Sequence, residues 1–198
     1  MGGTFDPIHI GHLVTAEEAR FQYELDEVMF VPSARPPHKT GSRQSPAEDR
    51  LRMVELAVEG NPFLSVSDIE AGREGLSYTI DTLREVHRIR GTETELYFIT
   101  GADAILEILT WKDPEELLSE SKFIAATRPG YPLERLEDAL PQLNSAGEKA
   151  LRRVFAMEIP ALAISSTDIR ERAAAGRPYR YLVSHAVWTY IREKGLYA

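Results

Sequence analysis

The sequence predicts an α/β protein built on a doubly wound, mostly parallel sheet with helices on both faces. The first observation is that short runs of β-branched and aromatic residues alternate with longer amphipathic stretches, a pattern typical of parallel strands joined by helices. The second is that no repeat or low-complexity linker interrupts the 198 residues. We therefore expect a single domain over residues 1–198, in which about residues 160–198 form a small helical extension.

Each expected element follows from its local pattern. The candidate strands are apolar runs bounded by polar or turn residues, at residues 27–32, 63–68, 95–101, 122–127 and 154–159. The candidate helices are amphipathic stretches at residues 11–23, 46–60, 78–90, 102–109, 114–119, 133–143 and 183–194. The helix over 46–60 has one apolar face, which we expect to pack against the sheet. That face consists of Leu51, Val54, Ala57 and Val58.

Composition and charge exclude several classes of protein. There is no cysteine, so disulfides, thiolate nucleophiles and cysteine-ligated zinc are excluded. The formal net charge of −8 argues against general binding to nucleic acid or to an anionic membrane, since both need a basic surface. No apolar run approaches the ~20 residues of a membrane span, and no secretory leader is visible, so we expect a cytoplasmic protein. An anionic ligand would need locally concentrated positive charge.

The strongest functional signal lies in residues 1–12, which read MGGTFDPIHIGH. The paired glycines Gly2 and Gly3 predict a tight turn that lets the backbone approach a ligand closely. A helix is expected to begin near Gly11, where free backbone N–H groups favour an anion. His9 and His12 lie three residues apart across this helix start, so both imidazoles can reach one phosphate group. Gly11 leaves an open face for a flat base. A zinc site is the alternative, although no third ligand is apparent nearby.

Two connections follow strand ends, the edge at which open parallel sheets bind ligands. Residues 33–45 (SARPPHKTGSRQS) form a long loop rich in proline and basic residues, and Lys39 is its candidate phosphate contact. Residues 128–132 (RPGYP) follow another strand. A simple Pro-Gly turn and a ligand contact through Arg128 are equally compatible with this second segment.

Residues 164–170 (ISSTDIR) place three hydroxyl groups directly before a helix rich in Arg, Glu and Ala. These hydroxyls and the free N–H groups of the helix start can together bind phosphate. Arg170 lies about one turn further along, where its guanidinium can reach the same group. The alternative is an ordinary helix cap, in which Ser165 pairs with Asp168.

Three other positions are compatible with purely structural roles. Trp111 alone reads as a residue at the edge of the core, although its ring could also stack on a flat ligand. Tyr78 reads as a helix start with Ser77 as its cap. Asp103 is a common type of acid in the first turn of a helix.

The order and spacing of these segments resemble one enzyme family. GGTFDPIHIGH is similar to the signature of nucleotidyltransferases with a His-x-Gly-His motif, and more narrowly to bacterial nicotinate mononucleotide adenylyltransferases. The resemblance covers nearly the whole chain. Its further pieces are PPHK at 36–39, SYT at 77–79, GAD at 101–103, Trp111, RPGY at 128–131, ISSTDIR at 164–170 and YIREKGLY at 190–197.

The resemblance implies a Rossmann-like nucleotidyltransferase domain that transfers an adenylyl group from ATP to nicotinate mononucleotide and releases pyrophosphate. The attacking phosphate oxygen is already ionised at neutral pH, so the reaction needs no general base. Catalysis then depends on aligning two anions and stabilising the charge that develops between them. Mg²⁺ is expected on the ATP phosphates, held by phosphate and water without a metal site made by the protein.

The resemblance also assigns residues to three groups. The catalytic group, which concentrates positive charge, consists of His9, His12, Lys39 and Arg170. The ATP-binding group consists of Gly2, Gly3, Thr4, Phe5, Gly11, Gly101, Asp103, Ile164, Ser165, Ser166 and Thr167. The mononucleotide-binding group consists of Asp6, Tyr78, Thr79, Trp111 and Arg128.

Three rival functions share part of this pattern. A phosphopantetheine adenylyltransferase has a similar nucleotide motif, but is typically shorter and lacks the Pro-Pro-His-Lys loop. A class I aminoacyl-tRNA synthetase also uses His-Ile-Gly-His, but this chain has no room for an anticodon domain. A nucleotide sensor would bind without turnover. The sequence leaves open the choice between nicotinate and nicotinamide mononucleotide, and also the oligomeric state.

The start of the chain departs from the family. Members carry roughly five to eight residues before the Gly-Gly turn, which form the central strand, whereas here Gly2 follows Met1 directly. A sheet without its central strand would leave buried N–H and C=O groups without partners, at about 1–3 kcal/mol each. We therefore expect Met1 to be an internal methionine, buried at the end of that strand, in a natural chain that starts upstream.

Overall fold

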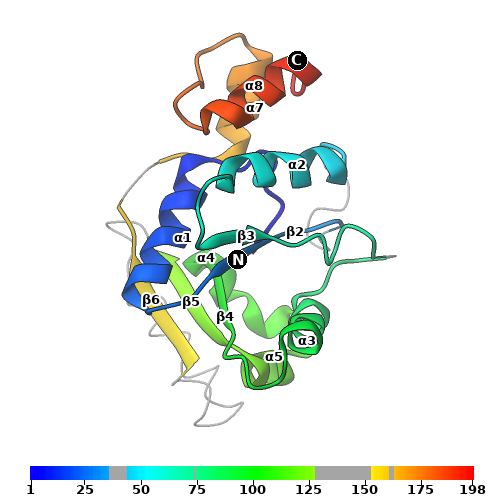
Figure 1. The fold of residues 1–198 in the computed structure, drawn as a ribbon, viewed down its shortest axis with the longest axis vertical. Coiled ribbons are helices and arrows are strands. Elements are labelled where there is room, and N and C mark those ends of the chain that lie inside the picture. The colour runs from blue at the N-terminus through cyan, green and yellow to red at the C-terminus, as the bar shows by residue number, and fades with distance from the viewer. Residues whose placement is uncertain (36–43, 74, 128–152, 161–162) are drawn as a thin grey trace. The chain divides into compact units, whose positions relative to one another are not determined.

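The computed structural model describes residues 1–35, 44–73, 75–127, 153–160 and 163–198 (Figure 1). The helix expected over 133–143 lies outside these residues. The chain divides into two compact units. The histidine unit comprises Gly3–Leu76 and Leu162–Ala198, and the central unit comprises Met1–Gly2 and Ser77–Ala161.

The histidine unit is built on a short sheet in the order β1-β2-β3. β1 (Gly2–Gly3) begins at the boundary between the units, β2 is Val28–Pro32 and β3 is Leu64–Val66. β2 and β3 run parallel, with Val28 opposite Leu64 and Phe30 opposite Val66. The helices α1 (Ile10–Gln22) and α2 (Ala47–Val58) contact β2, and α2 also contacts β3. The crossover through α2 therefore forms the βαβ unit that the alternating pattern predicts.

The buried face of α2 differs from the predicted one. Val54 and Val58 are buried as expected, but Leu51 and Ala57 are only half-buried. Arg50 and Met53 occupy the buried face in their place. An arginine is rarely fully buried without hydrogen-bond partners, and Arg50 has several.

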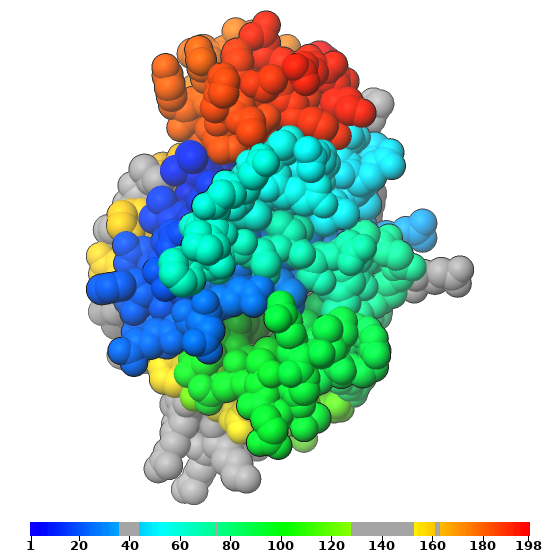
Figure 2. Space-filling model, in the orientation of Figure 1, coloured from blue at the N-terminus to red at the C-terminus, as the bar shows by residue number. Residues whose placement is uncertain are grey.

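Two further helices complete the histidine unit: α7 (Ser166–Ala174) and α8 (His185–Lys194). The Ser184 hydroxyl caps α8 by accepting from the Val187 N–H, and the helix ends at Gly195 with a φ of 63°, which glycine adopts readily. α8 packs on α2, and the two surfaces meet in Figure 2 where red borders cyan. The packing includes a hydrogen bond of 2.7 Å from the Tyr190 hydroxyl to Asp49.

The central unit carries a parallel sheet in the order β4-β5-β6. These strands are β4 (Tyr97–Gly101), β5 (Lys122–Thr127) and β6 (Val154–Glu158). The helices are α3 (Thr79–Arg90), α4 (Ala102–Leu106), the 3₁₀ turn η2 (Ile108–Thr110) and α5 (Pro114–Glu120). The single helix expected over 102–109 is thus broken into α4 and η2. The core residues are Ile80, Leu83, Ala102, Ile105, Ile108, Leu117, Leu118, Phe123 and Ala125.

The predicted α/β fold with parallel strands flanked by helices is confirmed, and the ends of all five predicted strands lie within two residues of the observed ones. β3 (Leu64–Val66) differs most, because it starts one residue late and stops two residues early. β1 has only two residues, and Met1, directly before it, is half-buried rather than buried. The upstream start stays a prediction. Within the described residues, no helix has the length and apolar character needed to cross a membrane.

Candidate active site

The turn that precedes α1 is shaped by two aromatic contacts. The Phe5 side chain is 3% exposed and its backbone has a φ of 48°. A Cβ on Gly3 would lie 2.9 Å from Phe5 Cζ, so only glycine fits above this ring. Phe5 packs edge-on against Phe30 and against His12, with ring centroids 5.5 and 5.1 Å apart. Because the Phe5 ring is buried, any ATP contact expected there would involve its backbone.

The two predicted histidines come together at the start of α1. His9 is the N-cap residue and is 7% exposed, whereas His12, in the first turn, is half-buried. Their rings stack, with centroids 3.6 Å apart and an interplanar angle of 20°. The His9 backbone N–H donates to Nδ1 of His12 over 3.2 Å. A nitrogen that accepts a hydrogen bond carries no proton, so the proton of a neutral His12 lies on Nε2.

Gly11 leaves room for this stacked pair. A Cβ at position 11 would lie 3.1 Å from both Cε1 and Nδ1 of His9, which is closer than ordinary van der Waals contact. The first-turn N–H groups of Ile10 and His12 donate to Leu182 and His9 carbonyls, each over 2.9 Å. No acceptor in the described part of the chain bonds the Gly11 N–H. This amide is therefore available to an anion at the helix N-terminus.

The ISSTDIR segment binds directly to the same turn. Arg170 donates from Nη1 to the Asp6 carbonyl over 2.7 Å, and the Ser166 hydroxyl donates to the Pro7 carbonyl over 2.8 Å. The first bond joins two residues that are 164 positions apart in the sequence, and the second joins two that are 159 positions apart. The predicted meeting of the histidine turn and the Arg170 segment is therefore present in the structure.

The three hydroxyls of this segment have different partners. Ser165 caps α7 by accepting from the Asp168 N–H over 3.1 Å, as the capping alternative expected. The helix begins at Ser166, so Ser166 and Thr167 lie in its first turn and only Ser165 precedes it. Thr167 is exposed and accepts from Nη2 of Arg170 over 3.3 Å, while Ile164 is buried. Ser165 and Thr167 are thus exposed, and Arg170 is half-buried, so all three offer polar groups toward solvent.

Asp6 joins the C-terminal end of the chain to the turn. Its carboxylate accepts from the Tyr197 hydroxyl over 2.6 Å and from the Ser45 N–H over 3.2 Å. Burial, followed by the hydrogen bond to Asp6, raises the pKa of Tyr197 well above its ordinary value. Asp6 is 4% exposed, so its carboxylate has a structural function in this arrangement, and its expected contact with the mononucleotide stays a prediction.

Arg50 is a residue that the sequence analysis missed. Its side chain donates to four backbone carbonyls, at distances of 2.6–3.2 Å, on Thr4, Ser33, Ala34 and Ser45. It is 1% exposed, and burial lowers the pKa of its guanidinium, while the charge of Asp6 opposes that change. Arg50 therefore fixes the turn after β1 and both ends of the loop that carries Lys39. The available signal was an arginine one helical turn before Val54, on a face expected to be apolar.

The central unit holds the remaining described candidates. Tyr78 is the N-cap of α3, so the predicted cap at Ser77 is wrong. The ring of Tyr78 lies 4.9 Å from Nζ of Lys112, which also pairs with Asp81 over 2.9 Å. Trp111 is half-buried and meets Phe98 edge-on at 6.0 Å between centroids. Both aromatic rings pack on the core while keeping part of their surface exposed.

The other expected positions divide between exposed, crowded and undescribed residues. Gly101 caps α4, Asp103 lies in its first turn, and both are exposed. A Cβ on Gly2 would lie 3.1 Å from the Phe98 ring. Lys39 and Arg128 lie outside the described residues. Among the residues that are described, no three His, Asp or Glu side chains gather as metal ligands do, so the zinc alternative gains no support.

Comparison with known proteins places this geometry in a family. The profile of the cytidylyltransferase-like family matches residues 1–172. A protein of Moorella thermoacetica named probable nicotinate-nucleotide adenylyltransferase is 58% identical over 197 residues, covering 100% of this chain and 89% of that protein. A protein of the same name from Streptomyces coelicolor is 49% identical, over 100% of this chain and 98% of its own.

A solved structure has the same fold. It is the nicotinic acid mononucleotide adenylyltransferase of Plasmodium falciparum complexed with NaAD, at a TM-score of 0.79 and 21% identity, over 99% of this chain and 94% of that one. This structure shows the fold, and the family model together with the relatives of much higher identity shows the family of this chain. The chain belongs to the cytidylyltransferase-like family and, within it, groups with the nicotinate-nucleotide adenylyltransferases.

Proposed function

We propose that this enzyme transfers the adenylyl group of ATP to nicotinate mononucleotide, forming nicotinate adenine dinucleotide for NAD biosynthesis and releasing pyrophosphate. The observation that carries the proposal is the stacked His9–His12 pair at the start of α1, with Arg170 bonded to the same turn. The names of relatives up to 58% identical support the choice of substrates.

The transfer needs charge stabilisation rather than proton abstraction. A phosphate oxygen of the mononucleotide attacks the α-phosphorus of ATP, a new P–O bond forms, and the bond to the β-phosphate bridging oxygen breaks. The Gly11 N–H and the Nε2–H of a neutral His12 can both donate to oxygens on the α-phosphorus, where negative charge develops. His12 therefore needs no added proton in order to act. Arg170 and Lys39 are proposed to hold the β- and γ-phosphates that leave.

The mononucleotide is proposed to bind through the central unit. Tyr78 and Trp111 each keep part of an aromatic face exposed while resting on the core. Rigid rings of this kind stack well on a pyridine ring. Thr79 and Arg128 complete this proposed subsite, and Gly101 with Asp103 are proposed to bind the adenosine ribose.

Mg²⁺ is proposed to arrive bound to ATP. The described residues hold no cluster of three ligating side chains, and the buried Asp6 carboxylate already accepts two hydrogen bonds. These residues fit an ion held by phosphate oxygens and water, the usual coordination of Mg²⁺ with nucleotides. The ion supplies charge neutralisation on the departing pyrophosphate. A cytoplasmic location is part of this proposal, because ATP is abundant there.

The test is pyrophosphate release with purified enzyme, MgATP and one acceptor at a time. We expect the highest kcat/KM with nicotinate mononucleotide, and comparison with nicotinamide mononucleotide measures the preference between acid and amide. Turnover only with phosphopantetheine would favour the related adenylyltransferase instead. Binding of ATP without any pyrophosphate release, with every acceptor, would favour a sensor.

A further inference from the structure

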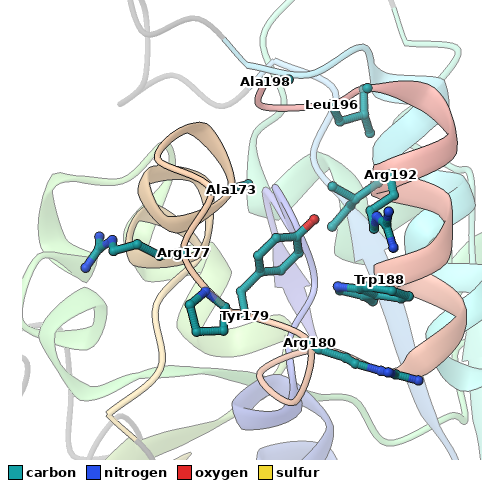
Figure 3. Close-up of a pocket in the computed structure, with 12 residues that line it drawn as sticks. Ala173, Arg177, Tyr179, Arg180, Trp188, Arg192, Leu196 and Ala198 are labelled. Carbon is teal, nitrogen blue, oxygen red and sulfur yellow. The ribbon is translucent and has the colours of Figure 1, made fainter.

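A cavity lies in the histidine unit, and none of its lining residues is among those assigned to the reaction. Its volume is about 460 Å³, within the range of small-molecule sites. Its walls are the end of α7, the connection that follows it, α8 and the last residues of the chain (Figure 3). The lining residues are Ala173, Gly176, Arg177, Pro178, Tyr179, Arg180, Trp188, Ile191, Arg192, Gly195, Leu196 and Ala198.

The charge of this cavity is opposite to that of the chain. The net charge of the protein is −8, yet no Asp or Glu lines the cavity, and the charges of Arg180 and Arg192 stand against a single anionic group, the α-carboxylate of Ala198. Within the described residues, Arg180 and Arg192 form no ion pair. Arginines usually find a carboxylate or phosphate partner because their planar donor fork matches one. Two such groups at one opening favour an anionic ligand.

The arginines are held in place by an aromatic ring. The guanidinium carbons of Arg180 and Arg192 lie 4.8 and 4.7 Å from the centre of the Trp188 ring. Figure 3 shows Trp188 between these two side chains, with the Tyr179 ring turned toward the cavity, while Arg177 points away from it. Stacking orients each guanidinium before any ligand arrives, so less side-chain entropy is lost on binding.

The rest of the lining is apolar. Ala173 and Leu196 present aliphatic surface, and the rings of Tyr179 and Trp188 also line the cavity. An inorganic anion would satisfy the arginines but leave this surface wet. A ligand with a flat ring and a phosphate would cover both parts of the cavity.

We propose that the cavity between α7 and α8 is a binding site for a nucleoside monophosphate, distinct from the site that contains His9 and His12. Arg180 and Arg192 bind the phosphate, and the apolar wall with Tyr179 and Trp188 receives the base.

Three covalently continuous segments connect this cavity to the proposed catalytic turn. α7 carries Arg170 in its second turn and lines the cavity at its end. The connection after α7 reaches Leu182, whose carbonyl accepts from the N–H of Ile10. Tyr197, between two lining residues, donates to Asp6. A ligand that shifts any of these walls is therefore expected to change the affinity for ATP, and the coupling must be reciprocal.

The binding experiment uses Trp188 as the reporter. The chain has two tryptophans, so a Trp111→Phe background leaves only Trp188 to fluoresce. GMP is the probe, and guanosine and inorganic phosphate are the two matched fragments. We expect saturable quenching by GMP and binding at least about 10-fold weaker for either fragment, because each satisfies only one part of the cavity.

Two sets of variants identify the site. Arg180→Gln with Arg192→Gln is expected to weaken GMP binding about 100-fold, since two charged hydrogen-bond donors are lost. The control, Arg20→Gln with Arg52→Gln, removes the same charge from ion pairs on α1 and α2, where Arg20 is half-buried and Arg52 exposed, and is expected to leave binding unchanged because neither residue lines the cavity. If the variant with both glutamines fails to fold, Arg180→Lys with Arg192→Lys replaces it. That variant keeps both positive charges but lacks the planar guanidinium donors, and is expected to bind GMP at least about 5-fold more weakly than the unmodified protein.

Three results would overturn the proposal. These are no saturable quenching at millimolar GMP, equal binding by phosphate alone (an anion site without a base pocket), or equal loss of affinity in the Arg20/Arg52 control. Coupling to the reaction is measured separately, as the change that GMP causes in KM for ATP. We expect that change to be larger in the unmodified enzyme than in the Arg180/Arg192 variant, and an identical change in both would refute the coupling.

Discussion

Arg50→Met removes a buried cation while keeping a side chain of similar length on the same face of α2. The variant leaves the carbonyls of Thr4, Ser33, Ala34 and Ser45 without the guanidinium that now binds all four. Hydrogen bonds to charged groups contribute about 1.5–3 kcal/mol each. The cost of burying the charge opposes this gain, and the four residues are half-buried, so water can replace part of what is lost.

The expected net loss is about 3–5 kcal/mol of the free energy of unfolding, the usual size for removing one side of a buried charged arrangement. For a chain of this length, that corresponds to a melting temperature lower by about 6–20 °C. KM for ATP should rise as well, because the turn after β1 and both ends of the Lys39 loop lose their common anchor. Differential scanning calorimetry and initial-rate kinetics measure the two effects.

Arg52→Met is the matched control, since Arg52 lies on the same helix but is exposed and forms an ion pair with Glu55 over 2.8 Å. We expect a change of no more than about 0.5 kcal/mol there. The reasoning about Arg50 is refuted if its variant melts within about 2 °C of the unmodified protein and keeps the same KM for ATP.

Three further predictions concern the histidine pair and the packing of α8. His12→Ala should lower kcat by about 10²–10³ while changing the calorimetric affinity for ATP little, and equal losses in both would contradict a role in the transition state. Gly11→Ala should lower kcat without changing the melting temperature, because its Cβ would press on the His9 ring at 3.1 Å; normal kinetics would show that the ring can move aside. Burial and the hydrogen bond to Asp49 raise the pKa of Tyr190 to about 12. Between pH 10 and about pH 12 the folded state keeps the Tyr190 proton while the unfolded state releases it. The contribution of Tyr190 to the free energy of unfolding is therefore complete below pH 10 and is lost as the pH rises toward 12. Tyr190→Phe should reduce this slope in unfolding experiments, and an unchanged slope would exclude the assignment.

The elements that depend on local pattern were predictable. β5 occupies the expected Lys122–Thr127, because a run of apolar residues between polar ends specifies a buried strand by itself. α3 ends at Arg90 as expected, where Gly91 takes a φ of 95°. The break between α4 and η2 was not predictable, since the same apolar spacing suits one longer helix.

The site residues that belong to one continuous sequence motif were predictable. The residues whose role depends on partners far away in the sequence were not. His9, Gly11 and His12 form one short motif whose geometry follows from the start of a helix. Arg50 and Tyr197 gave no such signal, because their roles come from backbone carbonyls and a carboxylate far away in the sequence. Tyr197 and Asp6 are 191 residues apart, and no periodicity relates positions so distant.

The bonds from Asp6, Pro7 and Ile10 to residues 166–197 also set the order in which the enzyme can become active during its synthesis. The ribosome releases the histidine turn first and its partners last, with the whole central unit between them. Contacts of such long sequence separation form late and slowly. A nascent chain that already contains both histidines and the complete central sheet would still lack Arg170 and the hydroxyl that binds Asp6. Adenylyl transfer is then expected to begin only after α8 has left the exit tunnel.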